Sequence, residues 1–299
     1  MWAAIKEMFR TSGDRLCLVF GVAFVAMSFA SLSLGDKWIF ALTASPNWFL
    51  LLIGLALLVG WALQAFLLSL LTGPGRPRHR VRRTGAGLRI ELPADRWIEV
   101  IPGSIQEQAS ADQHTGVVLP ANTAFDDECI SDKRSALGAF ATRHFSKTAA
   151  EIHALIRAEL ARALGKDAAD LPDQCTFGQT VFLDRPFGTH HRLIIVAVTR
   201  VSTEDGIRAD TDSVLAAVRG SFREAATRRL SRLFMPVLGS GHGGLTLSMA
   251  LSLILIQAMS CMLLEGYHHV KHLTVVVHDP EGTHWGDVKR TVQAVAAIP

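Results

Sequence analysis

The stretch Pro236-Val-Leu-Gly-Ser-Gly-His-Gly-Gly244 decides the fold of this chain. The apolar run at residues 233–238 predicts a buried strand, and the charge-free segment 246–264 predicts a helix. The glycines between them let the backbone approach a ligand closely. A glycine loop that leads from a strand into a helix start is typical of a phosphate site, because unpaired N–H groups favour anions. We therefore expect a phosphorylated ligand at this loop.

Short apolar runs alternate with helical stretches through the downstream part of the chain. The runs typical of strands are residues 88–92, 97–101, 117–119, 180–183, 193–201, 233–238 and 273–277. The stretches typical of helices are residues 136–145, 149–164, 214–229, 246–264 and 287–296. This alternation predicts an α/β domain with helices on both faces of a mixed, largely parallel sheet.

Two uncharged segments upstream are long enough to span a bilayer. Residues 16–34 and 48–71 contain 19 and 24 residues without a charge, and a spanning helix needs roughly 20. A cleaved signal peptide is the alternative for the first segment, but the second segment argues against it. We expect a two-helix transmembrane hairpin over residues 1–72, a basic linker over 73–87 and the α/β domain over 88–299.

Basic residues set the expected orientation of this hairpin. Lys6, Arg10 and Arg15 precede the first segment, and five arginines in the range 76–83 follow the second. The positive-inside rule then places both termini in the cytoplasm. The arginine run suits anionic headgroups better than nucleic acid, because it directly follows a span, so no nucleic-acid partner is expected. Residues 246–264 could form a third span, but Gln257 and four hydroxyl side chains within them favour a buried helix.

Several other nucleotide and metal motifs do not fit the chain. The loop glycines match G-x-G-x-x-G, but a dinucleotide-binding domain carries that pattern in its first strand–turn–helix unit. The Lys-Ser/Thr of a Walker loop is missing, and a hydrolase elbow needs a glycine two residues to each side of Ser240, where Leu238 and His242 stand instead. The four cysteines form no metal pattern and are expected to be free thiols. His190–His191 and the group His268, His269 and His272 lack the partners of a zinc site, so neither a metal nor a catalytic residue is expected.

A second motif ends in an asparagine. Residues 117–122 read as a buried strand that ends with Ala121 and Asn122, and the acidic residues Asp126 and Asp127 follow. An Asn amide can bridge a ribose diol by donating and accepting at once, or it can close a turn at the strand end.

Residues 97–105, 117–122 and 236–244, in this order and spacing, resemble the macro domain, which is an ADP-ribose-binding α/β/α fold. The resemblance covers roughly residues 88–299. With two spans in front, the chain also resembles the membrane-anchored macro-domain effectors of bacterial TIR-linked (Thoeris-type) anti-phage systems. In those systems, a TIR-domain enzyme is thought to make the ADP-ribose-derived signal.

The resemblance implies a set of ligand-binding residues. Ser104 and Ile105 would border the adenine, and Asn122, beside Ala121, would contact the distal ribose. Ser104 departs from the family, which usually has an acidic residue at this position to accept from the adenine amine. The loop residues implied around the diphosphate and this ribose are Leu238, Gly239, Ser240, Gly241, His242, Gly243 and Gly244, and Asp126 and Asp127 complete the expected site.

The implied function is that of a membrane effector. Its macro domain would bind ADP-ribose or an ADP-ribose conjugate and form a homo-oligomer. The paired spans would then disrupt the lipid bilayer of the bacterial inner membrane, with a TIR-domain enzyme as functional partner. The alternatives are a membrane-tethered ADP-ribosyl hydrolase and an ADP-ribose-dependent membrane recruiter. The first loop lacks the second asparagine and paired glycines that hydrolytic macro domains tend to show.

Overall fold

The computed structural model describes residues 79–202, 206–264, 266–279 and 281–298, and farther upstream the strands β1 (Ala30–Ser33) and β2 (Ile39–Leu42). The chain divides into two compact units, Met1–Arg76 and Pro77–Pro299, and this division falls inside the segment predicted as a linker. Each unit is described by itself.

In the first unit, β1 and β2 pair antiparallel, with Ala30 opposite Leu42. β1 occupies the end of the first predicted span, so these four residues form a strand and not part of a helix. Serine alternates with leucine over residues 31–34, a period-two pattern that suits a strand. The rest of both predicted spans lies outside the described residues. Among the residues described, no helix is both long enough and apolar enough to cross a bilayer.

A nine-stranded sheet forms the centre of the second unit, in the order β3-β4-β5-β11-β10-β6-β8-β7 with β9 paired to β8. Neighbouring strands from β5 to β8 in this order are parallel, whereas β3, β4, β7 and β9 each pair antiparallel. The strands are β3 (Arg80–Arg83), β4 (Leu88–Leu92), β5 (Arg96–Pro102), β6 (Thr115–Asn122), β7 (Thr180–Asp184), β8 (Arg192–Ser202), β9 (Gly206–Arg208), β10 (Arg232–Pro236) and β11 (His272–Val277).

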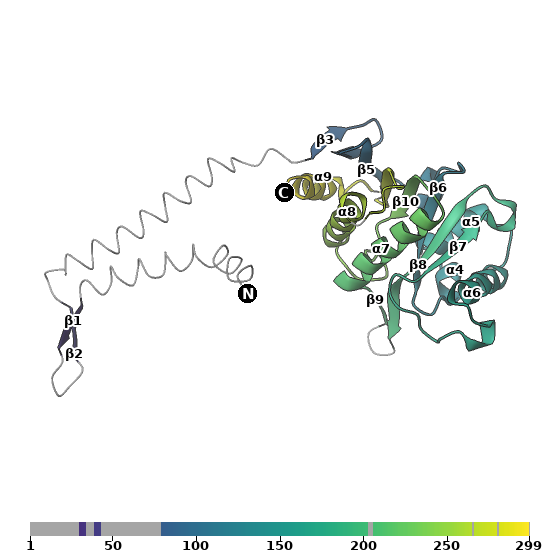
Figure 1. The fold of residues 1–299 in the computed structure, drawn as a ribbon, viewed down its shortest axis with the longest axis horizontal. Coiled ribbons are helices and arrows are strands. Elements are labelled where there is room, and N and C mark those ends of the chain that lie inside the picture. The colour runs from purple at the N-terminus through teal and green to yellow at the C-terminus, as the bar shows by residue number, and fades with distance from the viewer. Residues whose placement is uncertain are drawn as a thin grey trace. The chain divides into compact units, whose positions relative to one another are not determined.

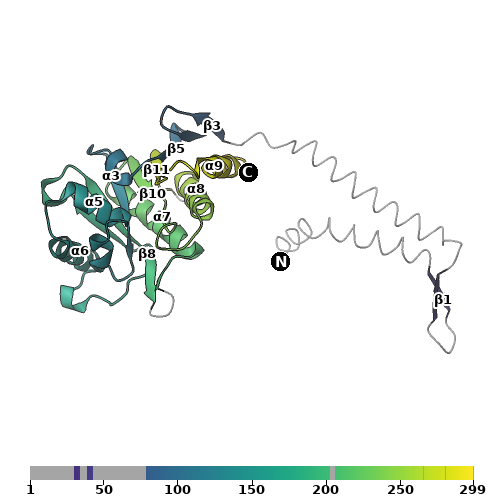
Figure 2. The same cartoon turned by 180° about the vertical axis from the view of Figure 1, so that it is seen from behind.

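Helices cover both faces of this sheet, which gives a three-layer α/β/α domain (Figures 1 and 2). One face carries α7 (Thr211–Thr227), α8 (Leu247–Leu263) and α9 (Trp285–Ala296). The other carries α3 (Ile105–Gln108), α4 (Glu128–Ser131), α5 (Ala136–His144) and α6 (Ala149–Leu164). Two short 3-10 turns, Ala168–Asp170 and Pro186–Gly188, complete the described helices.

The alternation of side chains along β8 shows how the sheet separates two cores. Leu193, Ile195 and Ala197 pack into the core beneath α5 and α6. Ile194, Val196 and Val198 pack into the core beneath α7, α8 and α9. Because successive residues of a strand point to opposite faces, an apolar run without alternation predicts burial on both sides.

The α/β fold with a mixed sheet is confirmed, and every strand and helix predicted downstream of residue 88 is present. The prediction of a linker over residues 73–87 was wrong for residues 80–83, which form β3 and pair with β4. Three of the four β3 residues are exposed arginines, so the strand lacks the apolar signal by which it could have been found. The charge-free segment 246–264 folds as α8, whose inner side belongs to the core.

Helix α7 lies unusually close to the segment that leads into β7. A Cβ atom added at Gly220 would stand 2.1 Å from the carbonyl oxygen of Gly178, and Gly178 itself has a φ of +75°. The backbone at Gly178 is held by its N–H, which donates to the Ala197 carbonyl at 2.9 Å. Two glycines therefore set the distance between α7 and this segment.

Gly220→Ala is expected to destabilise the domain, although alanine is the better helix former. The added methyl would meet backbone atoms that cannot rotate away, and such overpacking costs about 1–3 kcal/mol. Gly286→Ala in α9 is the matched control, because its Cβ would have nothing within 4 Å. Urea unfolding of both variants checks this, and equal midpoints would contradict the close approach.

Candidate functional site

A cavity of about 560 Å³ opens where the parallel strands end, a size within the range of roughly 300–1,000 Å³ that small-molecule sites occupy. Its base is formed by residues from four neighbouring strands: Pro120 and Ala121 of β6, Val198 of β8, Pro236 of β10 and Val276 of β11. Ligands of open α/β sheets bind outside the carboxyl ends of the strands.

A split between two strands makes room for this cavity. β10 pairs with β11 as far as Pro236 opposite Val276, but it pairs with β6 only as far as Phe234 opposite Val117. Beyond Phe234, β6 and β10 separate, and Pro236 and Pro120 line the cavity between them.

The glycine loop (residues 239–244) forms one wall and presents backbone N–H groups. Three of its carbonyl groups are used within the protein: those of Gly239, Gly241 and Gly243 accept from the N–H groups of Leu245, Gly244 and Ala209 at 3.1, 3.2 and 3.0 Å. Within the described residues, the N–H groups of Gly241, His242 and Gly243 have no acceptor in the protein. Such a run of unpaired donors attracts an anion.

Two glycines of the loop have opposite surroundings. A Cβ atom at Gly243 would lie 2.7 Å from both the Ala209 Cβ and the Gly239 oxygen, so the loop closes on itself there. A Cβ atom at Gly241 would meet nothing within 4 Å, although Gly241 lines the cavity. Gly243 is therefore required for the shape of the loop, and Gly241 borders the space that a ligand would fill.

Two of the helices that begin at the cavity, α5 and α8, are capped by side chains. Ser135 caps α5 by accepting from the Gly138 N–H at 2.8 Å, and Thr246 caps α8 by accepting from the Met249 N–H at 3.4 Å. Ser135, Ala136 and Leu247 line the cavity. The partial positive charge of each helix start adds to that of the loop amides and favours a negatively charged ligand.

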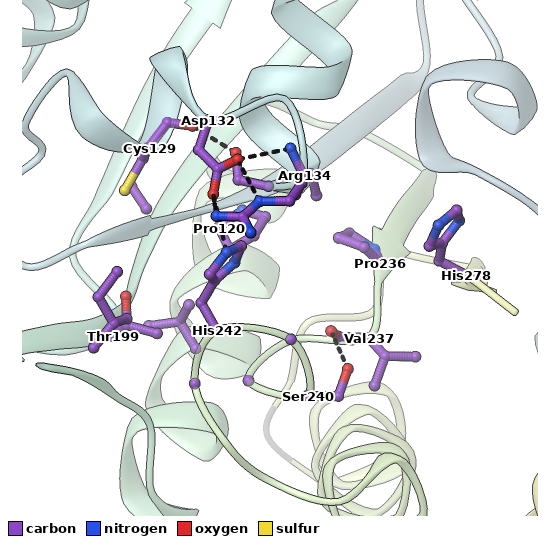
Figure 3. A pocket seen from close by; sticks show the side chains of 18 of the residues that line it. Pro120, Cys129, Asp132, Arg134, Thr199, Pro236, Val237, Ser240, His242 and His278 are labelled. Carbon is purple, nitrogen blue, oxygen red and sulfur yellow. Dashed lines mark hydrogen bonds and ion pairs between the residues drawn. The ribbon is translucent and has the colours of Figure 1, made fainter. Parts of the chain in front are cut away.

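The opposite wall carries a charged group from the loop between α4 and α5. Asp132 accepts from the Arg134 N–H, Nε and Nη2 groups at 2.9, 3.1 and 3.3 Å. Hydrogen bonds from the side chain and backbone of Arg134 lower the pKa of Asp132, so this carboxyl group is ionised at neutral pH. Figure 3 shows His242 rising from the glycine loop toward Asp132, and its Nε2 lies 2.9 Å from Asp132 Oδ2.

Six of the predicted site residues line the cavity: Ala121, Gly239, Ser240, Gly241, His242 and Gly243. Leu238 is fully buried beneath the loop, and Gly244, with a φ of +79°, closes its turn. Ser240 Oγ donates to the Val237 carbonyl at 3.2 Å, so this hydroxyl braces the loop.

Asn122 does not line the cavity, although its neighbour Ala121 does. The residue is 1% exposed, and its Nδ2 donates to Asp126 Oδ2 at 2.6 Å. The Asp126 N–H donates back to Asn122 Oδ1 at 3.4 Å, so the two residues close the turn after β6. Asp127 is the N-cap position of α4 and does not line the cavity either.

Neither residue expected beside the adenine lines the cavity, but one of them contacts a residue that does. Ile105 is buried at the start of α3 and does not line the cavity. Ser104 Oγ lies 3.4 Å from Nδ1 of His278, and His278 lines the cavity beyond the end of β11. In Figure 3, His278 and Pro236 lie on the side away from His242.

Sequence reasoning missed several lining residues, which are Glu128, Cys129, Asp132, Arg134, Thr199, His278 and His284. Most of them follow the predicted end of a strand. Ligands of α/β sheets bind beyond strand ends, so this position in the sequence could have identified them. Asp132 and Arg134, for example, directly precede Ser135, where a helix start was predicted.

Cys129 is the thiol group at the cavity. Burial raises its pKa to about 11, the Asn122 backbone opposes that shift, and the charges of Asp126 and Glu128 add to it. The group is therefore a thiol, and not a thiolate, at neutral pH. Among the residues that the structure describes, no three His, Cys, Asp or Glu side chains gather as metal ligands would.

The family model described as "Thoeris protein ThsA, Macro domain" matches residues 98–278, which is more than half of the chain. No curated protein was found to match. The matched segment runs from β5 to the end of β11 and contains the glycine loop and nearly the whole cavity lining.

Solved macrodomain structures are similar to this domain. A mutant macrodomain of Oceanobacillus iheyensis superposes with a TM-score of 0.50 at 13% identity, covering 69% of this chain and 95% of that chain. The macrodomain of the same organism with ADP gives 0.49 at 13% identity, covering 69% and 94%. A second mutant, with ADPR, gives 0.48 at 12% identity, covering 69% and 96%. The first of these superpositions shows that the domain has the macrodomain fold.

Iodoacetamide is expected to alkylate Cys129 at least about tenfold more slowly in the native chain than in urea, because only the unfolded thiol ionises near pH 8.5. The raised pKa predicts that the native rate stays low at pH 7.5 and increases only as the pH approaches 11. Mass spectrometry of the Cys129 peptide measures both rates. Equal rates at pH 7.5 would show that this thiol is neither shielded nor held protonated.

Proposed function

The chain belongs to the family of the Thoeris protein ThsA macro domain, and from that membership we propose that its cavity binds ADP-ribose or an ADP-ribose conjugate. The observation that carries the proposal is the set of three unpaired N–H groups at Gly241, His242 and Gly243. A diphosphate is the part of ADP-ribose that such a set would hold, because its oxygens accept several hydrogen bonds at once.

The rest of the cavity offers space on both sides of that diphosphate. Pro236, Val237 and Val276 form an apolar edge near His278, which suits the flat face of a base. Thr199 and Arg134 line the other side and supply polar groups for a ribose and for whatever it carries. We propose this orientation because Ser104, at the position expected beside the adenine, contacts His278.

The whole chain is proposed to act as a membrane effector of Thoeris-type anti-phage defence, at the bacterial inner membrane with both termini in the cytoplasm. Residues 16–34 and 48–71, which are free of charge, support the anchor as two spans of the lipid bilayer. A TIR-domain enzyme would supply the signal, and the bound chain would form a homo-oligomer that disrupts the membrane. The ligand can drive this assembly only through a higher affinity for the assembled state.

The geometry supports binding better than turnover. A hydrolase needs a group that positions and activates water. The Asp126 carboxylate could act in this way, but it is engaged by Asn122 at 2.6 Å and does not line the cavity. An assay for release of ADP-ribose from a modified protein tests the hydrolase alternative, and measurable turnover would favour it.

Gly241→Asp is expected to weaken ADP-ribose binding at least about 100-fold, because a carboxylate placed some 4 Å from a phosphate is repelled by several kcal/mol at an effective dielectric near 20. The fold should remain, since a Cβ at Gly241 has nothing within 4 Å. Gly241→Asn is the matched control, with the same shape and no charge. Calorimetry on the variants measures the affinities, and a Gly241→Asp affinity equal to that of wild type would place the diphosphate elsewhere.

Liposomes that hold the full chain are expected to release a trapped dye when ADP-ribose or its active conjugate is added, and the oligomer should grow at the same time. Gly241→Asp liposomes should stay sealed. Leakage measured by fluorescence and size measured by mass photometry separate an effector from a recruiter, because a recruiter binds the ligand without leakage.

A further inference from the structure

One contact joins the two walls of the cavity. His242 belongs to the glycine loop, Asp132 belongs to the loop between α4 and α5, and both residues line the cavity. Their side chains meet at 2.9 Å and are 39% and 30% exposed, which places the contact at the opening of the cavity. Elements separated by more than a hundred residues are linked there.

Asp132 is the fixed side of this contact. Its carbonyl accepts from the Ser135 N–H at 2.9 Å, and a Cβ added at Gly138 would lie 2.2 Å from that same oxygen, so α5 packs directly on it. Its carboxylate is held by three hydrogen bonds from Arg134. The position of this carboxylate is therefore set before His242 meets it.

His242 lies at the tip of the glycine loop, which is held less firmly than Asp132. The base of the glycine loop is anchored, because the Gly239 and Gly243 carbonyls accept from Leu245 and Ala209. The tip, at Gly241 and His242, is joined by the turn bond from the Gly244 N–H to the Gly241 carbonyl and by the contact of His242 with Asp132. Two of the three unpaired N–H groups, those of Gly241 and His242, lie on this tip.

We propose that the Asp132–His242 pair is a latch that holds the tip of the glycine loop in place and slows the escape of a bound nucleotide. Asp132 is then a positioning residue, which acts through His242 and touches no phosphate. The proposal rests on the proposed function for its ligand. The competing role for His242 is direct contact with the diphosphate, for which Asp132 would not be needed.

Hydrogen exchange on the ligand-free full chain in detergent tests the latch without any nucleotide. His242→Ala should speed exchange in residues 128–135, and Asp132→Ala should speed it in residues 239–245, because each change removes the contact and releases the opposite loop. Asp184→Ala is the matched control, since it removes the 3.0 Å pair with Arg192 at the start of β8, the end of that strand remote from the cavity. Unchanged exchange across the cavity in both variants, with unfolding temperatures like that of the control, overturns the latch.

The dissociation rate of ADP-ribose is the second readout, measured by stopped-flow displacement. Both single variants and the double variant should release the nucleotide about two- to fivefold faster than wild type, the size expected for the loss of one partly exposed hydrogen bond. The effects should not add, because one contact is lost in all three. Faster release in His242→Ala but not in Asp132→Ala would assign His242 to the phosphate and overturn the latch. If wild type binds no ADP-ribose, the proposed function fails, while the exchange experiment still decides the latch.

Discussion

The separation of two parallel strands is the constraint on which the site depends. β10 stays paired with β11 up to Pro236 but leaves β6 after Phe234. Two prolines, Pro120 and Pro236, line the opening, and proline has no N–H group to leave unpaired in such a gap. The sheet is continuous below this point, so the cavity has a rigid base. The chain after β10 must then cross the gap, and the glycine loop is that crossing.

Three carbonyls of the loop, those of Gly239, Gly241 and Gly243, accept from Leu245, Gly244 and Ala209. The N–H groups of Gly241, His242 and Gly243 have no acceptor among the described residues, and these three residues line the cavity. The downstream end of the loop is fixed by α8, whose inner residues are fully buried in the core. A loop that is already ordered does not have to be ordered when a ligand binds, so this cost does not reduce the free energy of binding.

Strands and helices could be predicted from the sequence where their apolar residues are buried. β8 and α6 were found because a two-sided apolar run and a capped amphipathic helix leave clear patterns. β3 was missed because an edge strand of arginines has no such pattern. In the site, the glycine loop was predictable because its residue types are nearly unique to sharp turns. Asp132 was not, since its role comes from a contact with His242 that only the tertiary fold creates.

For Asn122, the motif predicted the position of the residue but not the contacts of its side chain. Its position at the end of β6 was correct, yet the bulge there, between Ala121 and Asn122, brings the next residues into a turn that Asn122 and Asp126 close. Backbone amides hold any diphosphate alike, so they cannot tell one nucleotide from another. Any discrimination between nucleotides would then depend on side chains at the two ends of the cavity, with His278 at one end and Thr199 and Arg134 at the other. The glycine loop could be recognised from a sequence motif, whereas these side chains come together only in the folded domain.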